Sequence, residues 1–251
     1  VKTLCAVPSI IKKGAAWHRG IGTDNSPGTA IFSIVGNVVH SGLTEIPMGV
    51  TLRDLIFKLC GGPSGKKAFK AVQMGGPSGG CLPREFLEVP IDYDSLKKLG
   101  AMLGSGGIVV MDEDTCMVNI ARYFLDFTQK ESCGKCTFCR IGAHHMLRIL
   151  DRITMGEGRQ EDLDELEKLS EEIRAGALCN LGKTAPNPVI TTLKFFRDEY
   201  EAHINEKRCP AGVCRALTAF YIDLEKCARG CDACMGSCPV EAIFTTSDRK
   251  K

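Results

Sequence analysis

Three cysteines separated by two-residue gaps, Cys133, Cys136 and Cys139, form the most chemically specific pattern in this sequence. A C-x2-C-x2-C triplet can wrap one corner of a [4Fe–4S] cluster, with each thiolate on a different iron. The fourth thiolate must come from elsewhere in the chain. Cys179 is the obvious candidate because it follows Gly176, which ends a predicted helix. The sequence therefore predicts one cluster bound by these four cysteines; the alternative is a zinc site or uninvolved thiols.

A second cysteine run lies near the C-terminus, where Cys227, Cys231, Cys234 and Cys238 precede Pro239. Its first gap is one residue longer than in the bacterial ferredoxin run C-x2-C-x2-C-x3-C-P. In two-cluster ferredoxins the cysteine before the proline serves the other cluster, but no further run follows here. Either all four thiolates bind one cluster, or the partner motif lies beyond the last residue. A second iron–sulfur cluster is predicted, with the role of Cys238 left open.

A third group of donors surrounds a C-x4-C pair, Cys209 and Cys214. His203 lies six residues before the pair, and Cys116 is a spare thiol that could complete the set. Zinc prefers four thiolate and imidazole ligands in a tetrahedral arrangement. The hypothesis is a structural zinc site, and the alternative is a pair of ordinary reduced cysteines.

The number of cysteines, 14 in 251 residues, requires either a disulfide scaffold or a reduced metal protein. Close C-x-x-C spacings suit metal centres, and the N-terminus has no apolar segment typical of a signal peptide. We therefore expect a reduced, cytoplasmic protein. The formal net charge of +2 gives no indication of a nucleic-acid partner, and no apolar run is long enough to span a bilayer. No residue is assigned a catalytic role.

The elements that must position these donors fall into successive regions. Residues 1–27 contain a helical stretch and end in turn-forming residues. Residues 28–111 contain β-branched and aromatic runs, and a helix is expected to begin at the capping residue Thr51. This pattern predicts a small module of strands and one helix. The predicted strands are 29–39, 43–46, 69–74, 86–89 and 108–111.

Residues 112–207 read as helices with apolar faces. One of these helices is expected to begin with Asn187 as its cap and Pro188 in its first turn, to continue through Tyr200 and to end near His203. Residues 208–251 are too few to form their own apolar core, so we expect them to depend on a metal centre or a partner. The overall fold class is α+β.

Three stretches, 131–140, 177–188 and 196–200, carry a resemblance to a known family. The chain resembles the C-terminal half of the NADH-oxidising flavoprotein subunit of respiratory complex I. It is more similar still to the beta subunit of soluble NAD(P)-linked [FeFe] hydrogenases, including electron-bifurcating ones. The C-x4-C pair and the ferredoxin-like run are features of this hydrogenase branch. The resemblance covers nearly the whole chain.

The resemblance implies a fold and a set of cofactors. Residues 28–111 would contain a soluble-ligand-binding β-grasp (SLBB) module, and 112–207 a helical bundle that binds one [4Fe–4S] cluster. Residues 208–251 would form the zinc and ferredoxin-like segment. In the family, FMN and NAD(P)H bind an N-terminal α/β domain with a glycine-rich loop, and nothing in this chain matches that loop. Residues 1–27 would be the linker helix at the end of that missing flavin domain.

The function implied is electron transfer within an NAD(P)H-linked oxidoreductase. Electrons would pass between a flavin outside this chain and a hydrogenase or ferredoxin. The implied partners are a flavin- and NAD(P)H-binding domain or subunit, a thioredoxin-like [2Fe–2S] subunit and an [FeFe] hydrogenase catalytic subunit, with ferredoxin as a further candidate. The alternatives are part of the beta subunit of an NAD-dependent formate dehydrogenase, or a zinc-stabilised structural module.

Overall fold

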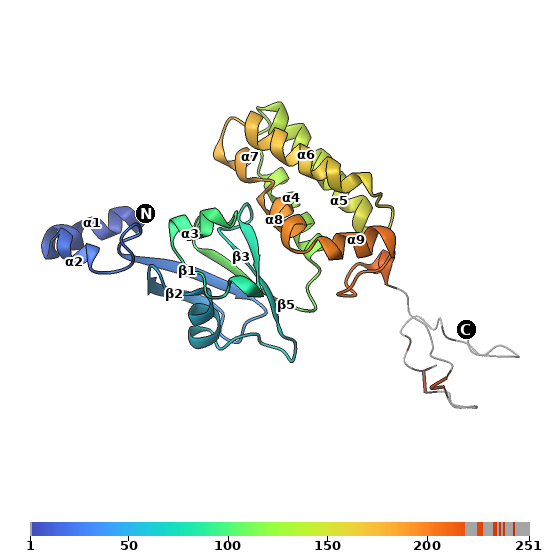
Figure 1. The fold of residues 1–251 in the computed structure, drawn as a ribbon, viewed down its shortest axis with the longest axis horizontal. Helices are drawn as coiled ribbons and strands as arrows, with labels where there is room; N and C mark the ends of the chain where they lie inside the picture. Colours follow the sequence, from blue (N-terminus) through green and yellow to red (C-terminus); the bar gives the residue numbers. More distant parts are fainter. Residues whose placement is uncertain are drawn as a thin grey trace, which may run out of the picture. The chain divides into compact units, whose positions relative to one another are not determined.

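The structure is a computed structural model that describes residues 2–218, together with 225–227, 233, 234, 236, 238 and 243. The chain divides into two compact units, Val1–Leu217 and Thr218–Lys251. The first unit contains a mixed sheet and a group of helices (Figure 1), so the predicted combination of helices and sheet is confirmed. Within the described residues, no helix is both long enough and apolar enough to cross a membrane.

Five strands form one sheet in the order β2-β1-β5-β3-β4. The strands are β1 Thr29–Gly36, β2 Gly42–Pro47, β3 Phe69–Met74, β4 Gly80–Pro83 and β5 Gly107–Asp112. Strands β1 and β5 are parallel, and the other neighbouring pairs are antiparallel. Along β1, Phe32 and Ile34 are buried whereas Ile31 and Val35 are exposed. Because side chains alternate along a strand, β1 is covered on one face only.

Strands β3 and β4, in contrast, are covered on both faces. Val72 of β3 belongs to a large apolar cluster that also contains Leu55, from the wide helical turn Asp54–Leu59. Its neighbour Ala71 points to the opposite face, where it packs with Met117 from the helical part of the chain. The second face of the sheet therefore contributes to the contact with the helices.

The helical part forms its own apolar cluster, in which Leu150, Leu166 and Tyr200 are fully buried. Across the described residues the α-helices are α1 Lys2–Lys13, α2 Ala15–Arg19, α3 Tyr93–Lys98, α4 Met117–Lys130, α5 Ala143–Thr154, α6 Glu161–Gly176, α7 Asn180–Thr184, α8 Asn187–Phe195 and α9 Arg197–Asn205. Short helical turns occur at Arg84–Phe86, Phe138–Gly142 and Arg215–Leu217.

One predicted strand, 86–89, is wrong. Residues Arg84–Phe86 form a helical turn, and the ring of Phe86 packs edge-on against Phe195 of α8, with 5.2 Å between ring centroids. The strand of this region lies earlier, at Gly80–Pro83.

The helix expected to run from Pro188 through Tyr200 is interrupted. Helix α8 ends at Phe195, and α9 begins at Arg197, because Phe196 adopts a non-helical backbone (φ −136°, ψ 37°). Asn187 was predicted to cap this helix, but it does not do so. Its side-chain amide instead donates a hydrogen bond to the carbonyl oxygen of Ser78 (3.0 Å).

Polar contacts join the sheet to the helical part in addition to the shared apolar cluster. The backbone N–H of Cys81 in β4 donates to Oγ1 of Thr191 in α8 (2.9 Å). Both groups are buried, so this hydrogen bond satisfies a donor that water cannot reach. The sheet and the helices therefore pack as a single unit.

Candidate metal centres

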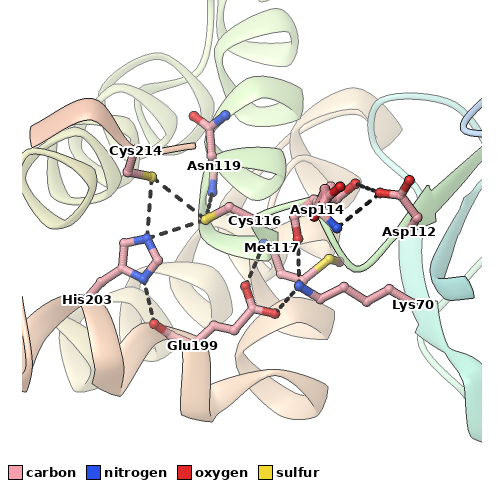
Figure 2. Close-up of polar contacts among 10 residues, drawn as sticks. Lys70, Asp112, Asp114, Cys116, Met117, Asn119, Glu199, His203 and Cys214 are labelled. Atoms are coloured by element: carbon pink, nitrogen blue, oxygen red, sulfur yellow. Dashed lines mark hydrogen bonds and ion pairs between the residues drawn. The ribbon is translucent and has the colours of Figure 1, made fainter. Parts of the chain in front are cut away.

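The four donors of the predicted zinc site come together in the structure. Cys116 directly precedes α4, His203 lies in α9, and Cys209 and Cys214 lie in the segment after α9. All four residues are buried, and their donor atoms lie within 4.8 Å of one another. Figure 2 shows that one ring nitrogen of His203 faces the sulfur atoms of both Cys116 and Cys214.

The geometry of this group, hereafter the Cys3His group, matches the chemistry of zinc. Nε2 of His203 lies 3.3 Å from Sγ of Cys116 and 3.4 Å from Sγ of Cys214, and the two sulfur atoms are 3.8 Å apart. Three thiols and one imidazole nitrogen are a standard donor set for a structural zinc ion. The residues present therefore fit a bound zinc ion.

The electrostatics of the group also indicate a place for a cation. A hydrogen bond with Cys116, together with burial, raises the pKa of Cys209 to about 12. Burial by itself would lower the pKa of His203, but the hydrogen bond and charge of Cys116 raise it to about 9. Because metal ligands must lose their protons, a bound metal would replace these protons with its own positive charge.

Two residues that support this group, Lys70 and Glu199, were missed by sequence reasoning. Glu199 accepts a hydrogen bond from the ring of His203 through its backbone carbonyl (2.7 Å). Its position four residues before His203 on one helix could have suggested this contact. Lys70, which pairs with Glu199, lies in a strand far away in sequence and gives no local signal.

The cysteines of the predicted [4Fe–4S] site lie on two segments of the helical part. Cys133, Cys136 and Cys139 follow α4, and Cys179 directly precedes α7. The loop before α7 contacts the triplet, because the backbone of Leu178 is hydrogen-bonded to the thiol of Cys136. That contact brings the residue next to Cys179 to the triplet.

Helix α7 packs directly on the triplet. A Cβ atom at Gly182 would lie 3.1 Å from Cβ and 3.5 Å from Sγ of Cys139. A larger residue at this position would therefore displace Cys139. Cys139 is buried, whereas Cys133 and Cys179 are exposed and Cys136 is intermediate, and none of the four forms a disulfide.

The local environment of Cys136 favours its thiolate form. Hydrogen bonds from the backbone of Leu178, and then of Cys139, lower the pKa of the Cys136 thiol, with a smaller contribution from the charge of Arg140. Arg140 also donates a hydrogen bond from Nη1 to the carbonyl oxygen of Gly134 (2.5 Å). Gly134 has a φ of 74°, a conformation that L side chains rarely adopt, so the turn within the triplet requires glycine.

Ser132 is a further residue that the sequence did not single out. Its hydroxyl lies 3.2 Å from Sγ of Cys139 and accepts a hydrogen bond from the N–H of Gly134 (3.3 Å). Its position next to Cys133 could have suggested a role beside the cysteine triplet.

The two donor groups differ in compactness. In the part of the chain that the structure describes, the Cys3His group alone has three or more donor atoms packed as closely as a single ion requires. Thiolates that each bind a different iron of one cluster do not need to meet at one point. Among the described residues, Cys133, Cys136, Cys139 and Cys179 form no group this compact.

One of the four ligands of the second predicted cluster site lies outside the described residues. Cys231 is not described, and Cys227, Cys234 and Cys238 are partly exposed.

Comparison with known proteins defines the class of this chain. Residues 119–203, which include the cysteine triplet and Cys179, match the family described as the NADH-ubiquinone oxidoreductase-F iron–sulfur binding region. The chain therefore contains an iron–sulfur binding region of this family.

Individual relatives extend the similarity to nearly the whole chain. It is 54% identical over 98% of its length to "NADP-reducing hydrogenase subunit HndC" of Solidesulfovibrio fructosivorans. It is 47% identical over 84% of its length to an NADH-quinone oxidoreductase subunit of Rhizobium meliloti. In both cases the chain spans 50% of the relative, so it corresponds to about half of these curated proteins.

A solved structure shares the fold. A chain of an NAD+-reducing [NiFe]-hydrogenase in the H2-reduced state superposes with a TM-score of 0.73 at 35% identity. The similarity covers 81% of the present chain and 34% of that hydrogenase chain. The resemblance to hydrogenase and complex I subunits that the motifs predicted is thus confirmed.

Proposed function

We propose that this chain is the iron–sulfur electron-transfer part of an NAD(P)H-linked oxidoreductase. The observation that carries the proposal is the approach of the Cys179 segment to the cysteine triplet, inside the region that matches the iron–sulfur family model. A bound [4Fe–4S] cluster would supply one-electron redox chemistry. The chain itself would hold the thiolates, fix their spacing and balance their negative charge with Arg140.

The donor and acceptor of these electrons belong to the proposal. Electrons would enter from FMN, reduced by NAD(P)H in a separate domain or subunit, and would leave toward a hydrogenase or ferredoxin. An [FeFe] hydrogenase subunit and a thioredoxin-like [2Fe–2S] subunit are the proposed partners. The names of the relatives, an NADP-reducing hydrogenase subunit and NADH-quinone oxidoreductase subunits, support this assignment. The reduced thiols suit the cytoplasm.

The described fold supports the proposed division into modules. Residues 28–111, which hold the five-stranded sheet, would correspond to the SLBB-like β-grasp module. Residues 112–207 would be the iron–sulfur bundle, and 208–251 would carry the end of the zinc site and a second cluster at Cys227, Cys231, Cys234 and Cys238.

The test of the ligand set replaces Cys179 with Ser in anaerobically purified protein. We expect the iron content to fall and one reduced-state EPR signal to disappear or change, because a triplet of thiolates lacks the fourth ligand. The signal of the C-terminal cluster should persist. The matched control is Cys5→Ser, which replaces an exposed cysteine on α1.

Two results would contradict the proposal in different ways. Unchanged iron and EPR signals in Cys179→Ser would remove Cys179 from the ligand set. A colourless wild-type protein that contains zinc but no iron would instead favour a structural module. A protein that is bleached by dithionite and reoxidised by added ferredoxin supports electron transfer.

We also propose that the Cys3His group binds a structural zinc ion. The mutual approach of its four donors to within 4.8 Å supports this assignment. Purified protein should contain one zinc per chain, and Cys209→Ser should lose zinc while retaining the visible absorbance of the clusters, because zinc has no redox role. Full iron content with much less than one zinc per chain would refute the site.

A further inference from the structure

A buried ion pair crosses the contact between the sheet and the helical part. Nζ of Lys70 in β3 lies 2.6 Å from Oε1 of Glu199 in α9, and the exposed fractions of the two side chains are 16% and 6%. Removing either charge would leave the other buried without a counter-ion, which is strongly unfavourable. The pair therefore fixes the position of α9 relative to β3.

Each member of this pair also contacts the backbone beside Cys116 (Figure 2). Lys70 donates a second hydrogen bond from Nζ to the carbonyl oxygen of Thr115 (2.6 Å). Glu199 accepts a hydrogen bond through Oε2 from the N–H of Met117 (3.0 Å). Met117 is the first residue of α4, where a carboxylate satisfies an unpaired N–H and interacts favourably with the helix dipole. The residues before and after Cys116 are thus held by Lys70 and Glu199 respectively.

Glu199 positions a second donor through its backbone. Its carbonyl oxygen lies 2.7 Å from Nδ1 of His203. A carbonyl can only accept, so Nδ1 carries a proton, and Nε2, which faces the sulfur atoms of Cys116 and Cys214, is the ring nitrogen that would bind a metal once it has lost its own proton. Metal-binding histidines are commonly oriented in this way by a partner on the other ring nitrogen. One residue therefore orients two of the four donors.

We infer that Lys70 and Glu199 are positioning residues of the Cys3His group, and that the metal affinity of this group depends on the sheet through them. The inference rests on the proposed zinc site and adds the sheet to its support. A pair that served only to stabilise packing would change the stability of the whole unit without changing the geometry of the metal.

The experiment measures zinc affinity in the full 251-residue chain by competition with a chromophoric chelator. Glu199→Gln keeps the size of the side chain and the backbone carbonyl but removes the charge that Lys70 requires, and Lys70→Met removes the other partner. The control is Lys67→Met, which breaks an ion pair with Asp114 (3.1 Å) whose two side chains are more than half exposed.

We expect Lys70→Met and Glu199→Gln each to weaken zinc binding by about 10-fold or more, as outer-shell substitutions typically do. The double variant should lose much less than the product of the two single losses, because both substitutions break one coupled pair. Lys67→Met should bind zinc as the wild type does. Cobalt substituted for zinc should show altered visible bands in the Lys70 and Glu199 variants only, which a purely structural role would not produce.

The outcomes separate the inference from the site on which it rests. A wild-type chain that binds no stoichiometric zinc refutes the zinc site. Wild-type zinc affinity and cobalt spectra in folded Lys70→Met and Glu199→Gln overturn the inference and leave the site intact. If Lys70→Met does not fold, Glu199→Gln alone decides in the same way, because it changes no side-chain volume appreciably.

Discussion

Gly182 lies where α7 contacts the cysteine triplet, and its replacement by Ala tests the proposed cluster geometry. An added Cβ would lie 2.7 Å from Cβ of Ala177 and 3.1 Å from Cβ of Cys139. Carbon atoms in contact prefer separations of about 3.5–4.0 Å, so these neighbours must move by roughly 0.4–0.8 Å. A functional centre must be held within about 0.5 Å of its working geometry, and a shift of about 0.4 Å at Cys139 uses up most of that margin, so we expect the cluster to be bound less tightly.

The effect on stability follows from two opposing contributions. Ala in place of Gly favours a helix by about 1 kcal/mol. Overpacking of a well-packed site costs about 1–3 kcal/mol, so the net change in the free energy of unfolding is a loss of about 1 kcal/mol. In a protein of this size we expect the melting temperature of Gly182→Ala to fall by about 2–4 °C.

The assay combines thermal unfolding with iron analysis and EPR of the anaerobically purified protein. Gly182→Ala should lose iron and one cluster signal, whereas the control Gly65→Ala should keep both. Gly65 is exposed, and a Cβ atom there would lie 3.9 Å from its nearest neighbour, the N atom of Lys67. Wild-type iron content, an unchanged signal and an unchanged or higher melting temperature in Gly182→Ala would refute the reasoning.

Two further predictions concern buried groups that are not among the proposed metal ligands. Burial raises the pKa of Cys81 to about 12, so its thiol stays protonated. Iodoacetamide at about pH 8.5 should therefore label the exposed Cys5 but not Cys81 in the folded protein, as measured by peptide mass. Labelling of both cysteines at equal rates would contradict this prediction. Tyr200→Phe removes a buried hydrogen bond with Oγ1 of Thr192 (2.8 Å). This loss should lower the free energy of unfolding by about 1 kcal/mol and the melting temperature by about 2–4 °C. An unchanged melting curve would contradict the prediction.

The strands show where sequence patterns suffice and where they do not. The run 69–74 contains Phe69, Val72 and Met74, ends before Gly75 and is buried on both faces, and it was predicted with its observed bounds. Strand β4, Gly80–Pro83, contains glycine and proline, which form strands poorly by themselves. It forms because Met74 pairs with Gly80 and Ala71 with Pro83 in the antiparallel register. The glycine-rich turn 75–79 that joins the two strands was the local signal of this hairpin.

The Cys3His group shows a similar division between donors and their support. Few residue types bind zinc, so the close C-x4-C pair, the nearby histidine and Cys116, one of four cysteines outside the other motifs, could be proposed as its four donors. The contacts that orient them could not be predicted in the same way. Whether Lys70 reaches Glu199 depends on how β3 packs against α9, and the interruption of the helix at Phe196, which sets the start of α9, was also not predicted.

Helix α4 connects the two proposed metal centres of the helical part. Cys116 lies immediately before its first residue, and Cys133 follows shortly after its last, Lys130. Its 14 residues span about 21 Å at the rise of an α-helix. A zinc ion at one end would therefore fix the start of the helix whose other end leads into the cluster ligands.

This arrangement assigns different tasks to the two centres. The proposed cluster lies beside exposed residues, Cys133 and Cys179, where an electron-transfer partner can approach. The Cys3His group is buried and includes Cys209 and Cys214, just before the first unit ends at Leu217. A redox-inactive ion suits that position, because it would fix α4, α9 and the segment leading to the second cysteine run without competing for electrons. The sheet would take part through Lys70, which makes the metal-binding part of the chain dependent on strands that contain none of its proposed ligands.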